Sequence, residues 1–242
     1  MIDIVYVLKD TDENEELVYS LRSVEKKLFN VRKVVFVGGK PKNLTPDYYI
    51  EVPQDQSSKW SNARKNIEVL CSDDSLTDNV ILMNDDFFIL RKTDATKIKN
   101  QVYGTLQEQI NRIIKRSGRS RYTRRLEKTM IFFKKRGIER PLNFETHTPF
   151  IFNRHDMLKL IKMNLPIILR TGYGIASGQI NECDIIESED KKFHSSDFKL
   201  KGDESFISSS DYSFQNGDIG KYIREKFNTP SRFEKGNICG NK

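Results

Sequence analysis

Two adjacent carboxylates and an amide interrupt an apolar run about a third of the way along the chain. The run extends from Val80 to Leu90, and Asn84, Asp85 and Asp86 lie at its centre. Burying two like charges inside a strand costs several kcal/mol, so these side chains must face water, a metal ion or a cation. Oxygen ligands of this kind suit Mg²⁺ or Mn²⁺. We expect Asp85 and Asp86 to bind a divalent metal ion that neutralises nucleotide phosphates, with an exposed turn as the alternative.

Other residue types suited to phosphate and hydroxyl chemistry are spread along the chain. A histidine titrates near neutral pH and can deprotonate an acceptor hydroxyl, whereas an arginine can clamp two phosphate oxygens at once. The plainer alternatives are a structural imidazole and a surface charge. Asp211 suits a metal ligand, a base or a helix cap. We predict as catalytic residues His147, Asp86, Arg170 and Asp211, and as donor-binding residues Arg22, Asn62, Asn84 and Asp85.

The elements that must position these residues follow a β-α-β order. Apolar, β-branched runs predict strands over 2–8, 34–37, 48–52 and 79–83, and apolar residues at helical spacing predict helices over 16–29 and 60–71. This alternation predicts an α/β fold with a mostly parallel sheet and helices on both faces. Ligands of such sheets bind at the carboxyl ends of the strands, and Asn84 follows one such end directly.

A strongly basic segment follows this half of the chain. Residues 96–136 have a long helical periodicity, and Ser117-Gly118 is a turn candidate, so we expect an inserted helical hairpin. Its charges form either a solvated face or a surface that grips an anionic polymer. The residues we expect to bind such an acceptor are Arg119, Arg121, Arg124 and Arg125.

The second half of the chain has weaker patterns. They predict a strand within 143–152, a short helix over 156–163, a loop lining the site over 171–178 and a helix over 218–227.

Composition restricts the class of protein. The chain has 242 residues, of which 31% are charged and 10% aromatic, and none of its apolar runs is as long as a membrane span. Its start leads straight into a strand pattern without a signal peptide, so we expect a cytoplasmic protein. A net charge of +7 favours anionic partners.

Four short motifs follow one another along the chain, and their order is informative. They are 14–23 with 31–37, then Asn-Asp-Asp-Phe-Phe at 84–88, Thr-His-Thr-Pro at 146–149, and Thr-Pro-Ser-Arg-Phe-Glu at 229–234. In this order they resemble conserved blocks of the Stealth family. The resemblance implies a nucleotide-sugar-dependent sugar-phosphate transferase of capsule synthesis, with a glycosyltransferase-A-like (Rossmann-like) core related to that of the lysosomal-targeting phosphotransferase.

Two departures suggest a small, trimmed relative. The first family block reads like Tyr-Thr-Trp-Val-Asp-Gly, whereas this chain has Val5–Asp10, and the family's late Asn-Asp pair is replaced by Ser210-Asp211. Such a relative could move the sugar itself in place of the sugar phosphate. The implied division is a nucleotide-sugar-binding half over 1–95, a basic helical insertion over 96–140, an acceptor half of the same domain over 141–234 and a flexible tail over 235–242.

The leading hypothesis is a metal-dependent transferase that uses a nucleotide diphosphate sugar, a UDP-sugar by resemblance, and an acceptor hydroxyl. The favoured acceptor is an anionic polymer, with phage-type hydroxymethylated DNA as the best guess and a teichoic or capsular polymer as the other. One alternative is a hexose-1-phosphate transferase of capsular or cell-wall synthesis. An alternative of another class is a nucleic-acid-binding protein without catalysis. The sequence leaves the sugar and the oligomeric state open.

Overall fold

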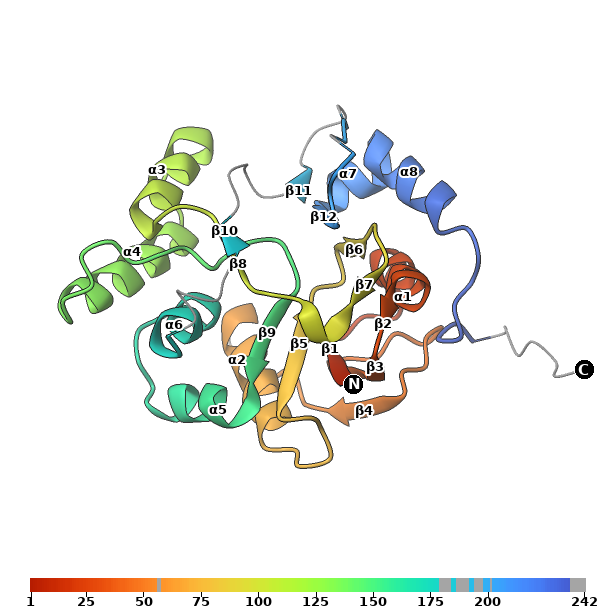
Figure 1. Ribbon diagram of the computed structural model, residues 1–242, viewed down its shortest axis with the longest axis horizontal. Coiled ribbons are helices and arrows are strands. Elements are labelled where there is room, and N and C mark those ends of the chain that lie inside the picture. Colours follow the sequence, from red (N-terminus) through yellow and green to blue (C-terminus); the bar gives the residue numbers. More distant parts are fainter. Residues whose placement is uncertain (56–57, 179–183, 186–191, 194–197, 201, 236–242) are drawn as a thin grey trace, which may run out of the picture.

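A central sheet of five strands organises the computed structural model, which describes residues 1–55, 58–178, 184–185, 192–193, 198–200 and 202–235 (Figure 1). The strand order is β4 (Tyr48–Glu51), β3 (Val31–Gly38), β1 (Ile2–Leu8), β5 (Asn79–Met83) and β9 (Phe150–Asn153). The first four are parallel and β9 is antiparallel to β5. The chain moves outward from β1 through β3 to β4 and then returns to the other side of β1, which puts a topological switch point between β1 and β5.

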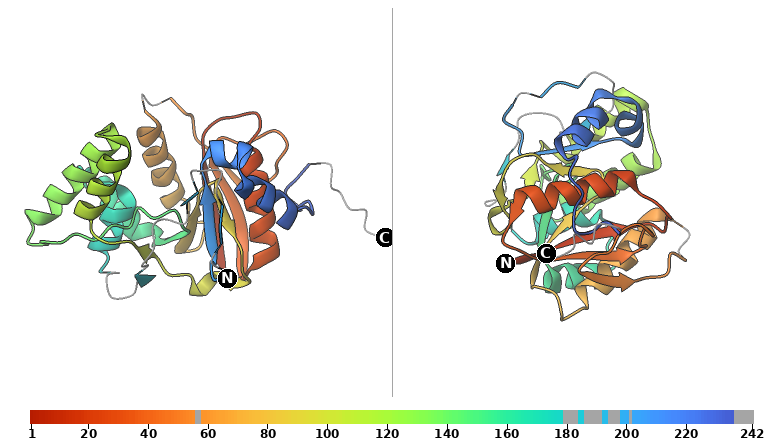
Figure 2. Two further views of the ribbon diagram at one scale, coloured as in Figure 1. Left: turned by 90° about the horizontal axis from the view of Figure 1, so that it is seen from above. Right: turned by 90° about the vertical axis from the view of Figure 1, so that its right-hand side faces the viewer.

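Helices cover both faces of this sheet (Figure 2). The side chains of each strand point alternately to one face and the other and pack against these helices. Ile4 and Tyr6 of β1 belong to the cluster that packs against α1 (Glu15–Lys27). Val5 belongs to the cluster on the opposite face, with α2 (Lys59–Cys71), α5 (Arg154–Lys162) and α6 (Leu169–Ala176). Period-two alternation therefore builds two apolar layers from one strand. The predicted mostly parallel α/β architecture is confirmed.

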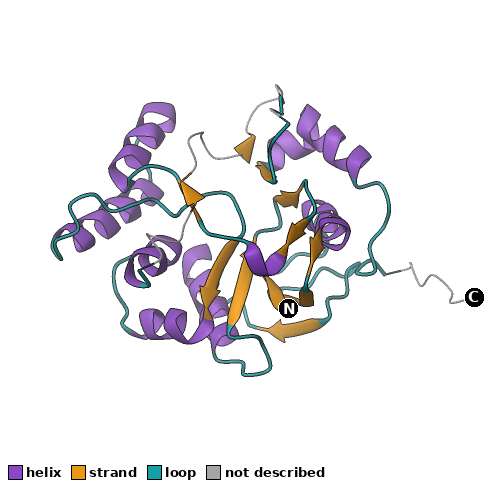
Figure 3. Cartoon of the chain, in the orientation of Figure 1, coloured by secondary structure: helices purple, strands orange, loops and turns teal. Residues whose placement is uncertain are grey.

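Smaller elements surround this core (Figure 3). A three-stranded sheet joins β6 (Phe87–Ile89), β12 (Phe206–Ser209) and β11 (Lys192–Phe193). Two-stranded pairs join β2 (Leu28–Phe29) to β7 (Thr93–Asp94), which precedes the 3-10 helix η1 (Ala95–Lys97), and β8 (Gln101–Val102) to β10 (Asp184–Ile185). The helices α7 (Asp211–Asn216) and α8 (Asp218–Lys226) pack on β6 and β12 through an apolar cluster that includes Phe88, Ile207 and Phe214.

The basic segment forms the expected helical hairpin. α3 (Leu106–Ser117) and α4 (Arg121–Lys134) pack through Leu106, Ile110 and Leu126. Gly118, at φ +75°, ends α3, and Ser120 caps α4 by accepting a bond from the Thr123 amide. Figure 1 places the hairpin beside the main sheet, on the side of α2 and α6.

Two predictions about the second half are wrong in part. Within 143–152 the strand covers only its end, as β9, and the predicted loop over 171–178 is largely the helix α6. Gly172 and Gly174 lie against neighbouring side chains that leave no room for a Cβ atom. A Cβ atom at Gly172 would come within 2.5 Å of Ile167, and one at Gly174 would come within 2.6 Å of Phe144. These glycines therefore allow α6 to approach its neighbours. Of the predicted tail, residues 236–242 lie outside the described part.

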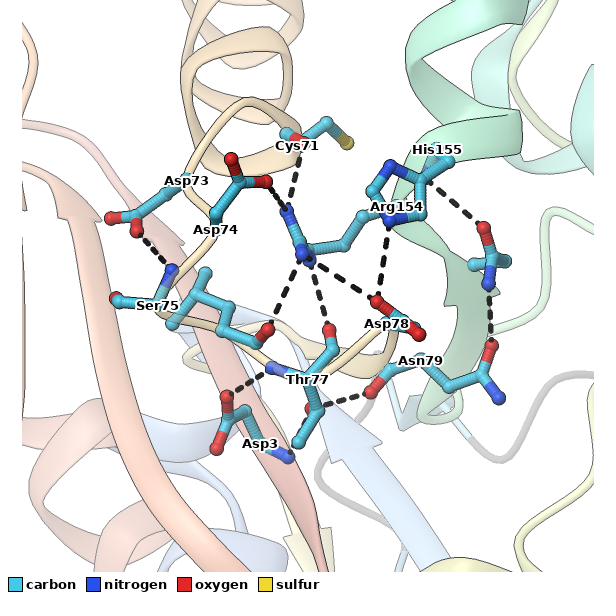
Figure 4. A network of polar contacts seen from close by, with 12 residues as sticks. Asp3, Cys71, Asp73, Asp74, Ser75, Thr77, Asp78, Asn79, Arg154 and His155 are labelled. Atoms are coloured by element: carbon cyan, nitrogen blue, oxygen red, sulfur yellow. Dashed lines mark hydrogen bonds and ion pairs between the residues drawn. The ribbon is translucent and has the colours of Figure 1, made fainter.

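A buried arginine joins α5 to the loop that precedes β5 (Figure 4). Arg154 is 2% exposed, and its guanidinium donates to the carbonyl oxygens of Cys71 at 3.0 Å, Leu76 at 3.3 Å and Thr77 at 2.9 Å. The carboxylates of Asp74 and Asp78 lie 4.0 and 3.8 Å away. Arg154 thereby fixes the start of β5, the strand that carries the acidic pair at its other end.

Replacing Arg154 by methionine should lower the free energy of unfolding by about 3 to 5 kcal/mol, because three carbonyl groups lose their donor inside the protein. Urea denaturation measures this change. Arg116→Met, an exposed arginine of α3, is the matched control and should change stability by less than about 0.5 kcal/mol. Equal effects of the two substitutions would show that the buried network does not stabilise the fold.

Candidate functional site

A cleft of about 530 Å³ opens at the carboxyl ends of β1 and β5. Its walls are the end of β1, the loop and first turn of α1, the first half of α2, the residue Asp85 after β5, and α7. This volume lies within the roughly 300–1,000 Å³ of small-molecule sites. The cleft adjoins the switch point between β1 and β5, where sheets of this topology bind their ligands.

Asp85 is held in the cleft by the residue that begins α1. The side chain of Asn14 caps the helix by accepting a bond from the Leu17 amide at 3.0 Å, and its Nδ2 donates to Asp85 Oδ2 at 2.7 Å. One amide therefore joins the loop after β1 to the loop after β5. This fixes one carboxylate oxygen of Asp85 in a wall of the cleft.

Three further carboxyl groups accompany Asp85. Glu16 accepts a bond from Ser209 Oγ at 2.8 Å, Asp86 is 8% exposed, and Asp211 lies in the cleft wall at the start of α7. Burial raises the pKa of Glu16 to about 7, and the negative charges of Asp86, Asp85 and Asp211 add to this rise. Asp211 is not the cap of α7, because Ser210 takes that role. The cleft therefore concentrates negative charge.

Asn84, His147 and Arg170 form a neighbouring group. Arg170, on α6, donates to the carbonyl oxygens of Thr146 at 2.8 Å and Thr148 at 3.2 Å, the residues on either side of His147. Its Nη2 reaches Asn84 Oδ1 at 3.5 Å. The rings of His147 and Phe87 pack edge to face, with their centres 6.3 Å apart. Three predicted residues thus come together next to Asp85, and Arg170 holds the segment that carries the histidine.

A half-buried carboxyl group, that of Glu145, supports this second group. Glu145 accepts a bond from the Thr171 amide at 3.0 Å. Burial raises its pKa, although the charges of Arg170 and Arg125 act in the opposite direction. Glu145 therefore lies within electrostatic reach of both the His147 segment and the basic hairpin.

The structure places Arg22 outside the cleft. Its guanidinium pairs with Glu234 at 2.6 Å and donates to the Phe227 carbonyl oxygen at 3.0 Å. This ion pair holds the pKa of Glu234 below its usual value. Arg22 thus anchors the C-terminal segment on α1, and the geometry does not bring it to a donor phosphate.

The wall opposite the acidic cluster is rich in amides. Asn62 and Asn66 of α2 line the cleft, and Gln54 Nε2 donates to Asn66 Oδ1 at 3.1 Å. Gly38, at φ +97°, lies against this pair, and a Cβ atom there would come within 2.5 Å of Asn66. The glycine therefore lets the end of β3 approach the amide wall, and the predicted donor-binding residue Asn62 lines the cleft.

The four predicted acceptor arginines divide into two groups. Arg119, Arg121 and Arg124 are exposed, and Arg119 has Glu127 at 3.6 Å. Arg125 is half-buried, and its guanidinium lies 5.1 Å from the centre of the Trp60 ring on α2.

The carboxylates around the cleft have the chemistry of divalent-ion ligands, but they do not form a complete metal site by themselves. In the described ranges, no group of three or more His, Cys, Asp or Glu side chains is arranged to hold a metal. Asp85 and Asp86 supply hard oxygen ligands, and their negative charges add to the rise in the pKa of Glu16 that burial causes. Such a site would take further ligands from phosphate oxygens, as magnesium sites often do.

Sequence reasoning missed Asn14, Glu16 and Glu145 as site residues. Asn14 is the first residue of an N-cap signature followed by acidic residues, so the helix start was visible in the sequence. Glu145 gave no comparable signal because its burial depends on α6.

Comparison with solved structures gives distant likenesses, one of which is a glycosyltransferase. No family model and no curated protein matches the chain. The apo-form glycosyltransferase GlyE in Streptococcus pneumoniae TIGR4 is similar at 10% identity with a TM-score of 0.43, over 94% of this chain and 60% of that chain. The chain thus spans about 60% of the length of GlyE. Among the described residues, no helix is both long and apolar enough to cross a membrane.

Glu16→Gln should remove a pH dependence of stability. The pKa of Glu16 rises from 4.5 to about 7 on folding, so the folded state binds the extra proton and stability falls as pH rises between these values. The substitution should flatten this fall by on the order of 1 to 2 kcal/mol, allowing for solvent screening. Urea denaturation in EDTA at pH 4.5 to 7.5 measures it. An unchanged slope of stability against pH would mean that folding does not raise the pKa of Glu16.

Proposed function

We propose that this protein is a metal-dependent transferase with a glycosyltransferase-A-like core. It moves a sugar from a nucleotide diphosphate sugar, a UDP-sugar by its resemblance to the Stealth family, to a hydroxyl of an anionic polymer. The observation that carries this proposal is the acidic cleft at the switch point of the sheet, with Asp85 in its wall and Asp86 next in the chain.

The acidic cleft and an anionic donor are compatible only through a cation. Glu16, Asp85 and Asp211 would repel a diphosphate, whereas a divalent ion bound by Asp85 and Asp86 would offset the charge of these two ligands. When bound, this ion would neutralise the diphosphate oxygens and stabilise the leaving group. Asn14 supports the arrangement by orienting Asp85.

The amide wall suits the nucleoside. Asn62, Asn66 and Gln54 offer both donors and acceptors, and a uracil edge presents both kinds of group. Lys59 lies in the same wall and adds a cation beside the start of α2. The donor would thus lie across the carboxyl ends of β1 and β3, with its diphosphate toward Asp85.

His147 is the proposed base. It would accept the proton of the acceptor hydroxyl as that oxygen attacks the anomeric carbon, while the bond from this carbon to the diphosphate oxygen breaks and the nucleoside diphosphate leaves. Arg170 positions the histidine through the two flanking carbonyl groups. Asn84 contacts Arg170 and lies beside Asp85, where it can orient the donor.

Incubation with Mn²⁺ and a panel of nucleotide sugars, with and without hydroxymethylated DNA, should release a nucleoside diphosphate that mass spectrometry identifies. Asp85→Asn should lower this turnover by about 100-fold or more, because the cation loses a charged ligand. Asp203→Asn, an exposed aspartate, is the control and should retain activity.

Other products would decide between the alternatives. Release of a nucleoside monophosphate would indicate transfer of a sugar phosphate, as in the Stealth enzymes, and would point to capsular or cell-wall acceptors. No release with any donor, together with binding of nucleic acid by the unmodified protein, would contradict the proposal and favour a binding protein without catalysis.

A further inference from the structure

A second pocket, of about 270 Å³, lies between α2 and α4. Trp60, Ser61 and Arg64 line it from α2, and Arg125 and Lys128 line it from α4. The segment 164–167 completes the wall. The same turns of α2 present Lys59, Asn62 and Asn66 to the acidic cleft, so this helix separates the two cavities.

The charge of this pocket is opposite to that of the cleft. Its lining includes three cationic side chains, Arg64, Arg125 and Lys128, and none of its described lining residues is acidic. Burial lowers the pKa of Arg125, the charge of Glu145 acts against this, and the neighbouring charge of Arg64 has a smaller lowering effect. Glu145 therefore offsets the repulsion between the two guanidinium groups in part, and a bound phosphate would add a second negative charge beside them.

The pocket also presents an aromatic ring. Trp60 is the only tryptophan of the chain, it is half-buried, and the guanidinium of Arg125 lies 5.1 Å from its ring centre. Arg64 is fixed because its Nη2 donates to the Ile161 carbonyl oxygen at 2.6 Å. A ring beside anchored guanidinium groups matches a ligand that carries a planar group next to a phosphate.

The surroundings indicate one unit of a longer ligand. The cavity is smaller than the roughly 300–1,000 Å³ that encloses a small molecule. The exposed arginines Arg121 and Arg124 continue the positive charge along α4. The charges of Arg125 and Arg170 both act on the carboxyl group of Glu145. This electrostatic interaction connects the pocket to the His147 segment.

We propose that this pocket binds one nucleotide of a single-stranded polynucleotide, with the base stacked on Trp60 and the phosphate bound by Arg64, Arg125 and Lys128. That this strand is the acceptor rests on the proposed function, whereas the binding itself does not. Of the four arginines predicted to bind the acceptor, Arg125 is the one that lines this pocket. The proposed binding site is therefore smaller than the predicted basic surface.

Titration with oligothymidylate in EDTA, without donor, tests the binding. The fluorescence of Trp60 should be quenched, and affinity should fall steeply with added salt. Fluorescence anisotropy of a labelled strand should show that Trp60→Ala weakens binding by about 5- to 100-fold and that Trp60→Phe retains most of it. Arg125→Ala should weaken binding by about 10-fold.

Matched controls separate this site from general charge and from catalysis. Lys115→Ala and Arg116→Ala, exposed on α3 of the same hairpin, should leave affinity within about twofold. Asp85→Asn should also leave it unchanged, so a failure of the donor cleft would not affect this result. Equal losses in the α3 variants, or tighter binding of poly(glycerol phosphate) that is insensitive to Trp60→Ala, would overturn the proposal.

Discussion

Mutual repulsion among four carboxyl groups is the constraint on which the site depends. Glu16, Asp85, Asp86 and Asp211 come from the loop after β5 and from the starts of α1 and α7, and the charges of the three aspartates add to the rise in the pKa of Glu16 that its burial causes. Asn14 and Ser209 hold two of them by hydrogen bonds, while the sheet fixes the ends of β1 and β5. Such a cluster is costly for folding unless a cation compensates it, so its presence is best explained by a ligand.

The two cavities divide the molecule by charge. The cleft over β1 and β5 is acidic and the pocket between α2 and α4 is basic, and α2 contributes to both. A donor that enters with a divalent ion and an acceptor that enters as a polyanion would therefore each find a separate surface. The charges of Arg170 and of Arg125, which lines the basic pocket, both act on Glu145.

The sequence predicted what depends on local pattern. The ranges of β1 and β5, the helical hairpin and the position of Asp85 follow from strand alternation, turn residues and the cost of burying charge. It could not predict what depends on tertiary contacts. Gly172 and Gly174 suggested a loop but serve close helix packing, and Arg22 suggested a phosphate clamp but pairs with Glu234, 212 residues later. Trp60 and Arg125 are also distant in sequence, so their pairing became visible only in the fold.

Anomalous diffraction from crystals grown with Mn²⁺ and a nucleoside diphosphate would show whether a metal ion joins the donor to the acidic cleft. A manganese peak should lie within bonding distance of carboxylate oxygens of Asp85 or Asp86 and of the diphosphate, with the nucleoside against Asn62 and Asn66. A diphosphate bound in the cleft without any metal, or a manganese ion bound only elsewhere, would contradict the proposal.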